Sequence, residues 1–148
     1  TIVPLPLSDK LKKGTLNMTS LEWGGALSTF AENYGDDGRK INKIFEFSTI
    51  GLPIQSIIKM LNLPPPEYLK VDVDGIEQLV LEGAGKYLKS INEILVEVND
   101  SFSQQSVSIC ELLIENGFRL KEKRSSELIS SDKRFSNTFN QIWVKSEH

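Results

Sequence analysis

A chain of 148 residues is long enough to bury the core of one domain, and we treat residues 1–148 as a single domain. With 39% hydrophobic and 25% charged residues, it has the composition of an ordinary globular protein. The formal net charge of −3 argues against a nucleic-acid-binding domain, which usually carries a basic face, and no apolar run approaches the roughly 18 residues of a membrane span.

The first third of the chain predicts short strands and one long loop. Residues 2–7 form an apolar run with two prolines, which suits an edge strand or a strand end, and Ser8-Asp9 follows as a turn. Further strands are expected over 15–19 and 41–48, with a loop between them. Because the chain enters a strand at once and lacks an initial methionine, we expect it to be the carboxyl-terminal part of a longer protein.

From Pro53 onward, predicted helices and strands alternate, which favours right-handed βαβ units and a largely parallel sheet with helices on both sides. The last two predicted strands have no helix between them, so we expect them to pair antiparallel. The expected helices are a segment from Pro53 to the prolines at 64–66, residues 76–88, and a segment around 107–114 that ends at Gly117; the expected strands are residues 69–73, 94–98, 118–122 and 139–144.

Polar side chains gather where two of these strands end. Lys70, Asp72 and Asp74 alternate with apolar residues, and Glu97 and Asn99 share a face of the next strand. Adjacent parallel strands would bring them together at the carboxyl edge of the sheet, where α/β proteins bind ligands.

Two other interpretations of these residues stay open. Lys70 and Glu97 could form a structural ion pair while Asp72 and Asp74 cap the following helix. A magnesium or calcium ion at Asp72, Asp74 and Asn99 is a weaker alternative, because acidic strand ends are common, and we assign no metal.

Other candidate residues have plainer interpretations beside the functional ones. Trp23, Phe30 and Tyr34 could line a substrate pocket or pack beneath the long loop. Cys110 lies on an apolar helical stripe, and a lone cysteine fits a reducing, cytoplasmic location. The only histidine is His148, at the chain end, which argues against histidine-based catalysis.

Three segments together resemble the FkbM-type methyltransferases: Lys-Val-Asp-Val-Asp-Gly-Ile-Glu at 70–77, Val-Leu-Glu-Gly-Ala at 80–84 and Ile-Leu-Val-Glu-Val at 94–98. Leu-Ser-Asp at 7–9 is similar to a turn in that family. The resemblance implies a Rossmann-like methyltransferase sheet, mostly parallel with an antiparallel last strand inserted into it. It also implies that the first two strands, with the glycine-rich cofactor loop, are missing from this chain.

The resemblance further implies S-adenosylmethionine as the cofactor of the full-length protein and a hydroxyl, on a sugar or other natural product, as the methyl acceptor. Catalytic roles fall to Asp72, Asp74 and Glu97, and substrate binding to Lys70 and Asn99. Ser8 and Asp9 would lie near the adenine, with Asp72 also touching the cofactor.

The alternative function is a non-catalytic α/β module for binding or assembly. An open sheet edge left by the missing strands would then allow self-association. We expect the present chain alone to be inactive, and we expect neither nucleic acid nor a membrane among its partners.

Overall fold

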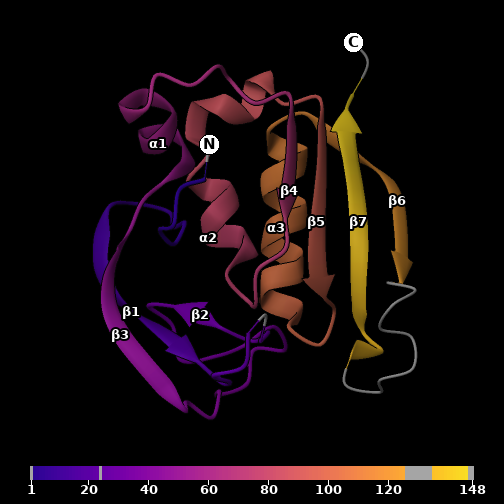
Figure 1. The fold of residues 1–148 in the computed structure, drawn as a ribbon. Helices are drawn as coiled ribbons and strands as arrows, with labels where there is room; N and C mark the ends of the chain where they lie inside the picture. The colour runs from indigo at the N-terminus through magenta and orange to yellow at the C-terminus, as the bar shows by residue number, and fades with distance from the viewer. Residues whose placement is uncertain (1, 24, 126–134, 147–148) are drawn as a thin grey trace.

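The computed structural model describes residues 2–23, 25–125 and 135–146, which form two β-sheets and their helices (Figure 1). Within these residues, no helix has the length and apolar character needed to cross a membrane. The elements in chain order are β1 (Lys12–Met18), β2 (Thr29–Phe30), β3 (Phe45–Gly51), α1 (Ile54–Met60), β4 (Tyr68–Val71), α2 (Glu77–Glu82), the 3₁₀ helix η1 (Gly85–Ser90), β5 (Glu93–Asn99), α3 (Ser103–Glu115), β6 (Phe118–Ser125) and β7 (Thr138–Lys145).

The smaller sheet has the strand order β2-β1-β3, and both of its pairings are antiparallel. Its core residue is Phe30, which is 2% exposed. The Phe30 ring lies against Gly14 of β1 and Gly51 of β3, where any side chain would collide with it. Two glycines therefore allow an aromatic ring to pack flat on this sheet.

The strand expected over residues 2–7 does not form. Leu7 makes only an isolated parallel bridge to Leu52, closed by bonds from Leu52 N to Pro6 O and from Ser8 N to Leu52 O. Pro4 and Pro6 have no backbone N–H, so this segment cannot donate a regular ladder of hydrogen bonds. The strand expectation was wrong because the apolar pattern outweighed the prolines.

The larger sheet is mixed, with the strand order β4-β5-β7-β6. β4 and β5 pair in parallel, and β7 lies between β5 and β6, antiparallel to both. Strands β4, β5 and β6 therefore run in one direction and β7 runs against them. The expected antiparallel pairing of the last two strands is observed.

The crossover helices α2 and α3 lie on one face of the mixed sheet, so the expectation of helices on both sides is wrong for the described residues (Figure 1). The steps from β4 to β5 and from β5 toward β6 go the same way, and right-handed crossovers then place α2 and α3 on the same face. Ile94, Val96 and Val98 are buried beneath them, at 0–3% exposure. The opposite face, which carries Leu95 and Ile142, stays partly exposed.

The single helix expected over residues 76–88 is broken into α2 and η1. Gly85 has φ +52°, a conformation that ends an α-helix. Gly83 lies so close to the carbonyl oxygen of Ser8 that a Cβ atom at this position would clash with it. The break therefore lets the segment before β1 dock onto the end of α2.

Candidate functional site

The ends of β4 and β5 bring together the acidic residues that the sequence singled out. The parallel register pairs Lys70 with Leu95 and Val71 with Val96, so its continuation sets Asp72 level with Glu97. Asp72, Asp74 and Asp36 all act electrostatically on Glu97. Four carboxyl groups from three segments of the chain therefore share one region at the carboxyl edge of the sheet.

Lys70 is paired with Asp72 rather than with Glu97. The Lys70 Nζ lies 2.7 Å from Asp72 Oδ2, and the two side chains are 64% and 47% exposed. The hydrogen bond and the charge of Asp72 raise the pKa of Lys70, with Glu97 adding at longer range. The alternative of a Lys70–Glu97 ion pair is wrong, because Asp72, two residues after Lys70 and directly after β4, meets the lysine first.

Asp74 holds the loop before β2 instead of capping a helix. Its Oδ2 accepts a hydrogen bond of 2.9 Å from the backbone N–H of Ser28. Helix α2 has Ile76 at its N-cap and no side-chain cap, so the capping interpretation of Asp72 and Asp74 is wrong. Burial raises the pKa of Asp74 more than its backbone hydrogen bonds lower it, and the negative charges of Asp36 and Asp72 raise it further.

Glu97 is the half-buried carboxylate of this group. Burial raises its pKa most, and Asp72, Asp74 and Asp36 raise it further, while Lys70 lowers it. A carboxylate with a raised pKa binds a proton more readily near neutral pH than an exposed one does. Burial likewise raises the pKa of Asp74, so two of the predicted residues share this property.

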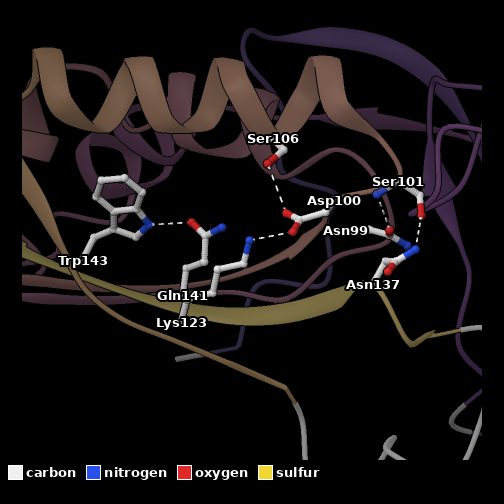
Figure 2. A network of polar contacts seen from close by, with 8 residues as sticks. All are labelled: Asn99, Asp100, Ser101, Ser106, Lys123, Asn137, Gln141 and Trp143. Carbon is white, nitrogen blue, oxygen red and sulfur yellow. Dashed lines mark hydrogen bonds and ion pairs between the residues drawn. The ribbon is translucent and has the colours of Figure 1, made fainter.

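Asn99 acts as a connector between strand β5 and the loop that carries Asp36. Its Nδ2 donates to Asp36 Oδ2 at 2.9 Å, and its Oδ1 accepts from the backbone N–H of Ser101, also at 2.9 Å. Ser101 Oγ in turn accepts a bond of 3.0 Å from Asn137 Nδ2 at the start of β7, as Figure 2 shows. Asn99 is 7% exposed, so its amide fixes the position of Asp36.

A second buried carboxyl group, Glu77, braces the turn between β4 and α2. Its Oε1 accepts from the Gly75 N–H at 3.2 Å and its Oε2 from Gln105 Nε2 at 2.7 Å, and Gln105 Nε2 also donates to Gly75 O at 2.8 Å. Glu77 is 4% exposed, and burial raises its pKa to about 8. Gly75, at φ +96°, lies against the Gly35 carbonyl with no room for a side chain.

The model of the methyltransferase FkbM domain matches residues 4–120. The chain belongs to the FkbM methyltransferase family. A search of the curated proteins and a search of the solved structures each gave no match. The family match ends within β6, but β7 lies between β5 and β6, so this strand beyond the match belongs to the same sheet.

Beside the acidic residues, the FkbM domain has an open cleft of about 730 Å³. Its walls are the loop from Gly35 to Asn42, Ser101 and residues 135–137, with Asp36 on the side toward Asn99. The three aromatic residues proposed to line a pocket do not line this cleft. Phe30 is in the core, Tyr34 packs edge-on against Phe102 at 5.3 Å, and Trp23 is fully exposed.

Ser8 and Asp9 lie at the other end of α2 from the acidic residues. The Ser8 carbonyl contacts Gly83, the C-cap of α2, whereas Glu77 begins that helix. Ser8 Oγ bonds Asp9 Oδ1 at 2.9 Å, and Asp9 also pairs with Lys12 at 3.1 Å. Burial alone would raise the pKa of Asp9, but these partners outweigh it and lower the pKa. The contact of Ser8 and Asp9 with adenine stays a prediction.

The described residues contain no group of three or more His, Cys, Asp or Glu side chains arranged to hold a metal ion. The divalent-cation alternative at Asp72, Asp74 and Asn99 includes an asparagine and stays a prediction. Cys110 is a free thiol that packs against the core, as expected. His148 falls outside the described residues.

Proposed function

We propose that this FkbM domain contributes the acceptor side of an S-adenosylmethionine-dependent O-methyltransferase site. The observation that carries the proposal is the convergence of carboxylates at the ends of β4 and β5, with the pKa of Glu97 raised by burial and by its neighbours. Glu97 would accept the proton that the acceptor hydroxyl loses on methylation.

The residues at the strand ends fit a cationic ligand. Like charges raise the pKa of both Asp74 and Glu97, so a positive group placed among them would relieve their mutual repulsion. When bound, S-adenosylmethionine supplies the methyl group and carries that positive charge. Asp72, which is the more exposed of the two carboxylates that follow β4 and is paired with Lys70, would face the reacting groups.

The acceptor in this proposal occupies the cleft beside Asp36. Asp37, Asn42 and Ser101 offer hydrogen-bonding groups there, and Leu27 and Ile41 offer apolar contacts. This mixture suits a hydroxyl-rich molecule such as a sugar, whose hydroxyls need acceptors and whose ring faces are apolar. Holding the hydroxyl close to the methyl group is the main source of rate in such a reaction.

The rest of the cofactor site would pair with the free edge of β4. Among the described residues, β4 has one strand neighbour, β5. A strand added there would carry its own carboxyl end to the same crevice as Asp72. We therefore propose that the 148-residue chain does not bind the cofactor by itself and that the product of the complete gene does.

Calorimetric titration with S-adenosylhomocysteine tests this arrangement on both proteins. We expect binding by the complete gene product and weak or no binding by the 148-residue chain. In the complete protein, Glu97→Gln and Asp72→Ala should each lower methyl transfer at least tenfold, while Glu93→Gln, at the other end of β5, should not. Full activity of Glu97→Gln would remove that residue from the role of base.

The alternative is a non-catalytic module for binding or assembly, and the same titration separates the two. If the complete gene product binds no S-adenosylhomocysteine, the family fold would serve here as a scaffold. The carboxylates would then be a structural feature of the sheet edge.

A further inference from the structure

The sheet edges of this chain differ in how well they are protected against pairing with another strand. Natural proteins protect exposed edges with lysine, with bulges or with short strands. β6 is charged along its length, with Lys121, Lys123 and Arg124 among its residues, and a register shift interrupts it at residues 120–122. β2 has two residues and β4 has four.

β3 has none of these protections. It is seven residues long, Glu46 is its one charged residue, and β1 is its one strand partner among the described residues. Its large side chains are exposed on both faces: Phe45 is 48%, Phe47 44% and Ile50 46% exposed, and Ile44, just before the strand, is 61% exposed. An unprotected apolar strand of this length is a template for another strand.

The hydrogen bonds within the small sheet show which backbone groups of β3 are free to pair. The Ala31 N–H donates to Thr15 O at 2.9 Å, so the odd-numbered residues of β1 direct their backbone groups toward β2 and the even-numbered ones toward β3. The register pairs those even-numbered residues with the odd-numbered residues of β3, which therefore bond to β1. Leu52, just after β3, accordingly directs its N–H and carbonyl away from β1, to Pro6 and Ser8. The even-numbered residues Glu46, Ser48 and Ile50 then direct theirs toward the free edge. A partner strand must therefore pair with these three residues.

We propose that two copies of this chain associate through β3, antiparallel and about a two-fold axis at Phe47. Phe47 then lies opposite Phe47 of the second copy, and Phe45 lies opposite Thr49. Ile44 lies opposite Ile50, so the exposed apolar residues cover one another. Glu46 lies opposite Ser48, so no like charges meet. The two small sheets become one sheet of six strands, and the free edge of β3 is closed.

The size of this contact sets its strength. A large side chain covers on the order of 150–200 Å² when fully buried, so four that are about half exposed contribute roughly 350 Å² per copy. With both copies and the paired backbones included, the total surface area buried in the contact is near the lower limit of about 1,000 Å² for specific interfaces. We therefore expect a dimer with a micromolar dissociation constant. This association is independent of the proposed methyl transfer.

Sedimentation velocity over a concentration series from about 1 to 200 µM tests the dimer. Phe47→Lys would place two positive charges face to face, and Ser48→Pro would remove an N–H that β1 does not use, so each should raise the dissociation constant at least tenfold. Leu120→Lys is the matched control, because Leu120 is also 44% exposed but lies on the protected strand β6. It should leave the dimer unchanged.

Disulfide trapping tests the register in a Cys110→Ser background. Phe47→Cys should form a symmetric disulfide on mild oxidation, because the two Cα atoms would lie within disulfide range, whereas Glu46→Cys should not. A monomer throughout the concentration series would overturn the proposal. So would open-ended assemblies, dimers that neither β3 variant weakens, or trapping through residue 46 in preference to residue 47.

Discussion

The buried carboxyl group of Glu77 predicts an unusual dependence of stability on pH. Its pKa is raised from 4.5 to about 8 in the folded chain, so between these values the folded state keeps a proton that the unfolded state releases. Stability from this group is therefore complete below pH 4.5 and is lost as the pH rises toward 8. At about 1.36 kcal/mol for each unit of pKa difference, the loss between pH 5 and 8 comes to about 3–4 kcal/mol.

Urea unfolding at pH 5, 6, 7 and 8 measures this effect by comparing the wild type with Glu77→Gln. The glutamine mimics the protonated acid, so the variant should gain about 3–4 kcal/mol relative to the wild type between pH 5 and 8. Asp74 and Glu97 titrate in both proteins, so the difference between the two proteins reports Glu77 together with its electrostatic coupling to these two groups. Glu82→Gln, on the exposed side of the same helix, is the control and should follow the wild type. Parallel curves for the wild type and Glu77→Gln would refute the reasoning.

Three further predictions follow from the same contacts. Gly75→Ala should lower stability by about 3 kcal/mol in thermal melts, because Gly75 has a positive φ and lies against a carbonyl. The control Gly117→Ala, also at positive φ but in open space, should cost about 1 kcal/mol, and equal losses would exclude the steric contact as the cause. Asp36→Asn removes a negative charge that helps to raise the pKa of Glu97, so the acidic limb of the pH–rate profile of the complete protein should move to lower pH. An unchanged acidic limb would show that Glu97 is not the base. Lys123→Ala breaks a 2.6 Å ion pair with Asp100 (Figure 2) and should lower the free energy of unfolding in urea by at most about 1 kcal/mol, because both side chains are partly exposed. A much larger decrease would mean that this ion pair supports the fold.

The sequence predicted the features that are encoded locally. The paired strands β4 and β5 could be found because each is an apolar run of the right length. The acidic residues at their ends could be found because they follow those runs directly. The order of helices and strands after Pro53 could also be predicted, but the face of the sheet on which the helices lie could not, because it depends on the order of the strands in the sheet.

The missed features depend on contacts between distant segments. Asp36 reaches the site through Asn99, 63 residues away in sequence, and Glu77 is braced by Gln105, 28 residues away. Asp36 was visible only as part of an Asp-Asp-Gly loop, and Glu77 only as a charged residue at a helix start. No local pattern shows that a charged side chain will be buried, because burial depends on which segments pack over it.

The position of β5 in its sheet has a consequence for the motions of the candidate site. β5 is paired on both sides, by β4 and β7, and three of its side chains are among the most deeply buried in the described chain. Its amide hydrogens should exchange with solvent last, and those on the free edge of β4 much earlier. Glu97 and Asn99 thus lie on β5, the strand whose hydrogen bonds open most slowly, whereas Asp72 and Asp74 follow β4, whose hydrogen bonds open sooner. A ligand in the crevice would therefore contact one rigid wall and one wall that can adjust to it.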